Sequence, residues 1–317
     1  MLKVLILPLA NIVFAILLVI LAPCSLFSQQ KKDSSVKVEG NYITLTEVVI
    51  NNKLNVPSFI NRIKNDTTFY KAFRTLHIIG FTALNDIRMV DKNSVTKASL
   101  LSKVKQVRKN NCRRMEVLQE TITGDLYDEK KNFNYYTGEM YAGLFFTRDS
   151  VCGEDNIVKG HEFSTAGVSG MEKHKQQLKM LFFNPGRKIS GIPLMGNKTA
   201  LFDDNMADRY DMSIDMTEYN KTSCYIFKIK AKENKKRDVV IDEMTTWFND
   251  KTFEIVARDY SLSYDAGVYD FNVQMHVEMT KFDQYLVPSL IRYNGNWKAI
   301  FKKRERGVFT ATLFDFH

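Results

Sequence analysis

Apolar and polar residues alternate with a period of two over most of the chain, a pattern typical of strands that bury one face. The longest uninterrupted case is Tyr269–Met279, in which every second residue is apolar and the residues between are polar or charged. An antiparallel sheet with one side on a core and the other in water requires this pattern. The buried face of this strand, and a candidate apolar ligand face, would consist of Tyr269, Phe271, Val273, Met275, Val277 and Met279.

Short turns are indicated between the strands. Asn294-Gly295 is a two-residue hairpin signal, because both residues tolerate positive φ, and it predicts a turn that joins strands 286–293 and 297–304. Asn249-Asp250-Lys251 predicts a second tight turn. The strands therefore follow one another as a long antiparallel meander.

Two helices are predicted before the meander. Pro57 suits the first turn of one helix, and the carboxylate of Asp66 can cap the start of the next. Apolar residues recur at helical spacing in both segments: Phe59, Ile60 and Ile63 in the first, and Phe69, Phe73 and Leu76 in the second.

A third, amphipathic helix is predicted as an insertion in the meander. Ser169 and Glu172 have the spacing of a capping box, and Asn184-Pro185-Gly186 ends the segment. Such a helix either packs on a sheet, the commoner arrangement, or lies on a membrane surface. Its apolar stripe, a candidate cover for the ligand face, consists of Met171, Leu178, Leu181 and Phe182.

The first residues have the order of a secretory signal. Lys3 precedes the apolar run 4–22, and cleavage is expected after Ser28. Two alternatives stay open: residues 4–22 could remain as an uncleaved membrane anchor, or Cys24 could be lipidated. We expect a signal peptide over 1–28, a linker over 29–40 and one β-rich domain over 41–317, located in the periplasm.

The cysteines predict at most one disulfide. Export brings the chain into an oxidising compartment, and removal of residues 1–28 leaves Cys112, Cys152 and Cys224. No pair has CxxC spacing, so neither a redox motif nor a zinc site is indicated. Cys112–Cys152 is the preferred pair, because both residues flank the same run of strands.

The chain is basic, with a formal net charge of +9. Its Lys and Arg residues cluster at 103–114, 228–237 and 298–306. In an exported protein such clusters favour an anionic membrane surface or envelope polysaccharide, and no nucleic-acid partner is expected. Solvated strand faces also carry Lys and Arg without any partner.

Candidate motifs for catalysis or metal binding are all incomplete. The stretch 167–170 lacks the second glycine of a nucleophile elbow, since Met171 stands in its place. His161-Glu162 lacks the second histidine of a zinc protease, since Thr165 stands four residues on. The acidic cluster 203–211 lacks the glycine turn and distal Glu of a calcium loop. We therefore expect no catalytic residue, metal or cofactor.

Several local motifs resemble a known family. The run Tyr225–Ile229 is followed by the turn sequence Thr246–Thr252, then by a strand with Arg258, and later by Val287-Pro288. In these features residues 210–295 resemble the periplasmic lipoprotein-carrier superfamily of LolA-like and RseB-like proteins, in which an Asp stands where this chain has Asn249. The chain also looks like an exported family of Gram-negative envelope proteins.

The resemblance implies a curved half-barrel whose apolar concave face, covered by helices, holds acyl chains. It implies a non-catalytic binding or carrier protein for a lipid or an acylated protein. A curved sheet with a Phe-, Tyr- and Met-rich face under helices can enclose such a cavity, or can simply be a filled core. Two other functions stay open: an outer-membrane β-barrel, because 308–316 alternate towards a near-terminal aromatic residue, and an enzyme with an unrecognised active site.

Overall fold

The computed structural model describes residues 34–38, 41–45, 47–48, 54–147, 149–158, 179–189, 195, 197–203, 206–299 and 302–317. Its helices are α2 (Val56–Asn65), α3 (Thr68–Thr75) and α4 (Tyr136–Phe145), with 3-10 turns η1 (Ala207–Arg209) and η2 (Glu233–Asp238). Its strands are β1 (Ser34–Val38), β2 (Asn41–Leu45), β3 (Glu47–Val48), β4 (Phe81–Val90), β5 (Thr96–Lys109), β6 (Cys112–Gly124), β7 (Ser150–Cys152), β8 (Tyr210–Tyr219), β9 (Thr222–Ala231), β10 (Ile241–Asn249), β11 (Ile255–Asp265), β12 (Tyr269–Phe282), β13 (Tyr285–Ala299) and β14 (Glu305–Phe314).

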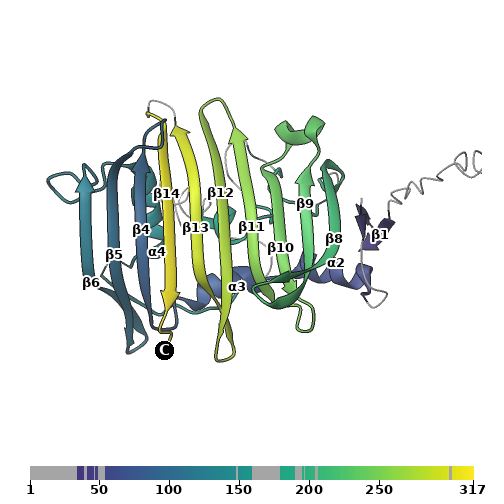
Figure 1. Ribbon diagram of the computed structural model, residues 1–317, viewed down its shortest axis with the longest axis horizontal. Coiled ribbons are helices and arrows are strands. Elements are labelled where there is room, and N and C mark those ends of the chain that lie inside the picture. The colour runs from purple at the N-terminus through teal and green to yellow at the C-terminus, as the bar shows by residue number, and fades with distance from the viewer. Residues whose placement is uncertain are drawn as a thin grey trace, which may run out of the picture. The chain divides into compact units, whose positions relative to one another are not determined.

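Most of these strands form one sheet, in which strands that follow one another in the sequence mostly lie side by side (Figure 1). Over the described ranges the sheet has twelve strands in the order β3-β8-β9-β10-β11-β12-β13-β14-β4-β5-β6-β7. The two-residue β3 pairs in parallel with β8, and the other pairs are antiparallel. The last strand, β14, lies between β13 and β4 and so joins the early strands to the late ones. The predicted mainly β fold with a long antiparallel meander is confirmed, as an open sheet.

One face of the sheet is apolar and lies under the helices, all on the same side in Figure 1. Phe59 of α2 and Phe69 of α3 are almost fully buried against it. Helix α2 begins as the sequence predicts, with Pro57 in its first turn. Helix α3 has Thr67, not Asp66, at its N-cap position, and Asp66 Oδ1 accepts a hydrogen bond from Thr68 N at 3.1 Å from one residue further back. Each large apolar side chain buried in this layer contributes about 1.5–3 kcal/mol relative to exposure.

The predicted hairpin at Asn294-Gly295 is wrong, because β13 runs through both residues without turning. Gly295 lies on the inner face, where the side chain of Tyr293 crosses its backbone. A Cβ at residue 295 would lie 2.1 Å from the Tyr293 hydroxyl oxygen. The glycine is needed for this close approach rather than for a turn.

Other elements differ from the sequence prediction or lie outside what is described. Ser34–Val38, expected within a linker, is strand β1 and pairs with β2. Of the predicted inserted helix, residues 179–183 are helical, whereas 169–178 lie outside the described residues, as does the signal segment 1–28. None of the helices described is long and apolar enough to cross a membrane.

Candidate functional site

The strand predicted as an apolar ligand face, now β12, points its apolar side chains into the layer under the helices. Phe271, Val273, Met275 and Val277 are buried, and Tyr269 and Met279 are half-buried against the same core. Phe271 stacks on Trp297 with ring centroids 4.6 Å apart.

Part of the predicted covering helix lies over this face. Leu181 and Phe182 are buried, and the Phe182 ring meets Trp297 edge-on with centroids 6.1 Å apart. The Tyr260 hydroxyl donates a hydrogen bond to the Phe182 carbonyl oxygen and so fixes the segment to β11. Met171 and Leu178, the other two predicted covering residues, lie outside the described residues.

A narrow cleft opens in the same layer, between the inner face of the sheet and helices α3 and α4. Its volume is about 40 Å³. Ala83 of β4 and Ala311 of β14, on paired strands, contribute small side chains to its floor; Ala83 lies opposite Leu313, and Ala311 lies opposite Asn85. The apolar walls come from both layers: Phe73, Leu76, Phe81, Phe145, Phe183 and Leu313.

One end of the cleft is charged. His77 and Arg113 line it, and Arg113 donates two hydrogen bonds to the carboxylate of Glu154. His77 Nδ1 lies 3.0 Å from Glu154 Oε1 without a well-aligned hydrogen bond. Burial, reinforced by the charge of Arg113, lowers the pKa of His77 to about 4. At neutral pH the end of the cleft therefore carries a guanidinium, a carboxylate and a neutral imidazole.

Gln106 ties this charged end to α3. Its amide nitrogen donates to the carbonyl oxygens of Leu76 and Ile79 at 2.6 and 2.7 Å. Its amide oxygen accepts from Arg113 Nη1 at 3.2 Å. Because the amide is almost fully buried and uses both of its ends, it holds the C-terminal end of α3 and Arg113 in one arrangement.

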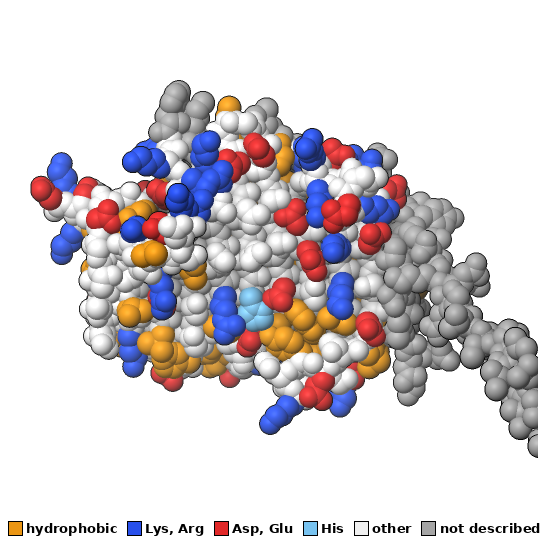
Figure 2. All heavy atoms as spheres, turned by 45° about the horizontal axis from the view of Figure 1, so that its top comes forward, with side chains coloured by type: hydrophobic (Ala, Val, Ile, Leu, Met, Phe, Trp, Pro, Cys, Tyr) orange, Lys and Arg blue, Asp and Glu red, His pale blue; other side chains and the backbone are white. Residues whose placement is uncertain are grey.

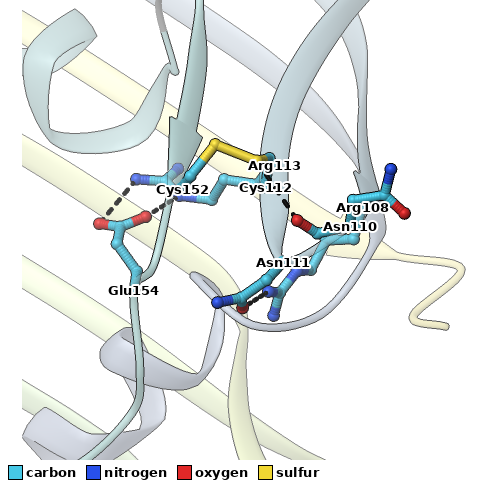
Figure 3. Close-up of a disulfide and its surroundings, with 7 residues drawn as sticks. All are labelled: Arg108, Asn110, Asn111, Cys112, Arg113, Cys152 and Glu154. Atoms are coloured by element: carbon cyan, nitrogen blue, oxygen red, sulfur yellow. Dashed lines mark hydrogen bonds and ion pairs between the residues drawn. A yellow bond between two sulfur atoms is a disulfide. The ribbon is translucent and has the colours of Figure 1, made fainter.

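The disulfide preferred from the sequence, Cys112–Cys152, is present in the structure (Figure 3). The two residues lie directly opposite each other, Cys112 at the start of β6 and Cys152 at the end of the three-residue β7. Glu154 follows two residues later and reaches Arg113, the residue next to Cys112, as Figure 3 shows. The bridge thus fixes strand β7, which ends two residues before the carboxylate of Glu154. Cys224 is free and buried.

A second cation lies on the inner face, at Arg258 of β11. Its Nε donates to Thr246 Oγ1 at 2.9 Å, and its guanidinium lies 4.2 Å from the centroid of the Phe69 ring. Burial lowers the pKa of Arg258 to about 10, so the group is still charged at neutral pH. The residue that carried part of the family resemblance is therefore an interior cation under α3.

The sequence prediction missed the polar end of the cleft. Gln106 follows Val104 on the buried face of β5. A polar residue at a position that continues the buried face of a strand was the signal that could have identified it. As far as the structure describes the chain, no three His, Cys, Asp or Glu residues are grouped to hold a metal ion.

No family model and no curated protein matches this sequence. Among solved structures, the chain is similar to a domain from Vibrio parahaemolyticus described as an outer membrane lipoprotein-sorting protein, with 6% identity and a TM-score of 0.26 over 78% of this chain and 88% of that one. It is also similar to a DUF1329 family protein from Desulfovibrio piger, with 11% identity and a TM-score of 0.24 over 79% of this chain and 93% of that one. The first belongs to the class that the sequence motifs resemble, and at this level of similarity neither assigns a function.

Proposed function

We propose that this protein is a non-catalytic binding protein of the cell envelope, which holds an amphipathic ligand with an acyl chain between its sheet and its helices. The observation that carries the proposal is the cleft itself, with Phe-rich walls and a half-buried guanidinium, Arg113, at one end. An acyl chain matches the walls through the hydrophobic effect. A carboxylate or phosphate head group matches Arg113, which forms paired hydrogen bonds with such groups.

Ligand entry on this proposal requires the layers to separate. A volume of about 40 Å³ holds a water-sized group, whereas pockets for larger organic ligands measure about 300–1,000 Å³. Contacts between the sheet and α3, α4 and 179–183 are mainly apolar, and Met140 and Met180 among them repack easily. The incoming anionic head group would replace Glu154 as the partner of Arg113. The basic net charge favours exchange of ligand at an anionic membrane surface.

The test is equilibrium binding of a dansyl-labelled undecanoic acid to the mature chain, compared between Ala311→Leu and Thr312→Leu. Ala311 faces the cleft, and its neighbour Thr312 is exposed on the opposite face of β14. We expect Ala311→Leu to weaken probe binding at least tenfold, because the new side chain fills the cleft floor, and Thr312→Leu to leave it unchanged.

Competition by lauric acid and lauryl alcohol tests the head group, since the acid should displace the probe at lower concentration if Arg113 binds it. Ala311→Val is the milder variant if Ala311→Leu fails to fold, because overpacking costs about 1–3 kcal/mol. Absence of probe binding by the wild-type chain, or equal binding by both Leu variants, would contradict the proposal.

A further inference from the structure

The face of the sheet turned away from the helices is hollowed across five strands, β10 to β14. The hollow has a volume of about 650 Å³, within the range of about 300–1,000 Å³ that ligand pockets occupy. Figure 2 shows backbone and neutral polar side chains over the middle of this face, with Lys and Arg side chains gathered along its upper border. The hollow shares no side chain position with the cleft of the inner layer.

Neutral hydrogen-bonding side chains lie on all five strands of the hollow: Thr245, Ser261, Gln274, Asn294 and Thr310. Ser261, Gln274 and Asn294 lie directly opposite one another and form one row, with Glu243 of β10 and Val308 of β14 at its ends. Thr245 and Thr310 end the neighbouring row, whose middle positions are charged. Within the described part of the chain, none of the five neutral side chains hydrogen-bonds to another residue, although polar groups elsewhere on the same face do, as in Ser263–Asp242 and Arg304–Asn296. The hollow therefore offers a row of uncommitted donors and acceptors.

A charged group borders this row. His276 lies between two carboxylates: its Nδ1 contacts Asp259, and its Nε2 lies 3.2 Å from Glu278 Oε1. The hydrogen bond to Asp259 raises the pKa of His276, so the imidazolium offsets part of the carboxylate charge. Arg292, directly opposite His276 on β13, is exposed, and among the described residues no carboxylate pairs with it.

Each end of the hollow has a different chemistry. At the upper border, near the β13–β14 connection, Lys298, Lys302 and Lys303 are exposed cations. At the lower end, two residues beyond Thr245 on β10, Trp247 packs against Tyr219 with ring centroids 5.0 Å apart.

We infer that this hollow binds an anionic saccharide, with ring hydroxyls on the neutral row and acidic groups towards Arg292 and the upper lysines. Hydroxyl groups both donate and accept, and so match amide and hydroxyl side chains. The lysines and Arg292 attract carboxylate, sulfate or phosphate substituents. A single-stranded nucleic acid fits less well, because it needs open aromatic platforms for its bases, and Tyr219 and Trp247 are packed on each other.

The experiment is isothermal titration calorimetry of the mature chain with tetragalacturonic acid, neutral maltotetraose and the oligonucleotide dT6. Variants Arg292→Gln and Asn294→Val alter the hollow, and Lys103→Gln removes one charge from the same face at β5, beyond the hollow. We expect saturable binding of tetragalacturonic acid that weakens at least tenfold in Arg292→Gln and at least threefold in Asn294→Val, with less than twofold change in Lys103→Gln. Maltotetraose should bind more weakly than the acid.

Absence of saturable binding of the acidic tetrasaccharide would overturn the inference, and so would tighter binding of dT6. Equal losses of affinity for the acidic tetrasaccharide in Arg292→Gln and Lys103→Gln would mean that binding reflects only general attraction between charges, and would also overturn the inference. Binding of the dansyl fatty acid should be unchanged in Arg292→Gln, so the experiments test this site and the inner cleft independently.

Discussion

The side chain of Tyr293 lies across the backbone of Gly295 and reaches the next residue of the same face, Trp297. Trp297 Nε1 donates a hydrogen bond to the Tyr293 hydroxyl at 2.8 Å. The Tyr293 ring also meets Tyr141 of α4, with centroids 4.4 Å apart. Because Gly295 has no side chain, the Tyr293 ring can lie over its backbone and reach helix α4, so the glycine supports a contact between the sheet and a helix.

We predict that Gly295→Ala lowers the free energy of unfolding by about 1–3 kcal/mol, because the added Cβ collides with the Tyr293 hydroxyl. Gly143→Ala is the matched control: its Cβ would meet nothing within 4 Å, and alanine in helix α4 should stabilise by about 0.5–1 kcal/mol. Urea denaturation followed by tryptophan fluorescence measures both. Equal stability of the two variants would show that Tyr293 moves aside without cost.

Single residues explain where the sequence prediction failed at this scale. The alternation of apolar and polar residues identifies which face of β13 is buried. It does not show that the side chain of Tyr293 bends along its own strand, and without that information Asn294-Gly295 predicts a turn. Gln106 was missed for the opposite reason, because its burial depends on carbonyl groups at the end of α3 that come together only in the folded chain.

At the scale of elements, the edge of the sheet depends on the disulfide. Strand β7 has three residues and pairs only with β6 in the described sheet order, too few contacts to hold a strand on their own. Beyond β7, Glu154 binds Arg113, and Asp155 binds Arg74 of α3 at 2.7 Å. The bridge therefore links an edge strand to the helical layer.

We predict that reduction, or the double variant Cys112→Ser/Cys152→Ser, lowers the free energy of unfolding by about 2–4 kcal/mol. The bond closes a loop with a sequence separation of 40 residues, for which lost chain entropy corresponds to about 4 kcal/mol. Denaturation with and without dithiothreitol measures the change. Dithiothreitol should leave the double variant unaffected; a similar loss there would mean that the reductant acts elsewhere.

Helices and strands in which apolar residues recur regularly were predictable from the sequence, and elements without such a pattern were not. Helices α2 and α3 carry a clear apolar stripe and were predicted to begin near their observed first residues. Helix α4 has almost no stripe, since it buries residues such as Thr137, Gly138 and Met140 on more than one side, and the sequence prediction missed it. The position of β14 between β13 and β4 depends on pairing between distant segments, which local patterns do not encode.

At the scale of the whole molecule, the two sides of the sheet hold histidines with opposite shifts. On the inner side, burial and the charge of Arg113 lower the pKa of His77 to about 4. On the outer side, the hydrogen bond to Asp259 raises the pKa of His276 above its usual value near 6.5. The free energy of unfolding should therefore decline on both sides of a maximum near neutral pH.

The direction of each pH dependence follows from whether the folded or the unfolded chain binds the proton more tightly. Between pH 6.5 and about 4, the unfolded chain protonates His77 and the folded chain does not, so stability falls as pH falls, by up to about 1.4 kcal/mol per pH unit. As pH rises above 6.5, the folded chain keeps a proton on His276 that the unfolded chain has released, so the contribution of His276 is lost as pH passes its raised pKa.

We predict that His77→Asn reduces the dependence of the free energy of unfolding on pH below 6.5 and does not change it above 6.5. His276→Asn should have the opposite effect. Each variant is the control for the other. Urea denaturation between pH 5.5 and 9 measures both slopes; the lower limit lies above the ordinary pKa of 4.5 at which the unfolded chain protonates Glu154, whose pKa in the folded chain is held down by Arg113 and His77 against the effect of burial. An unchanged acid slope in His77→Asn would show that another group takes up the proton, and that the inner charged cluster does not shift His77 as its burial requires.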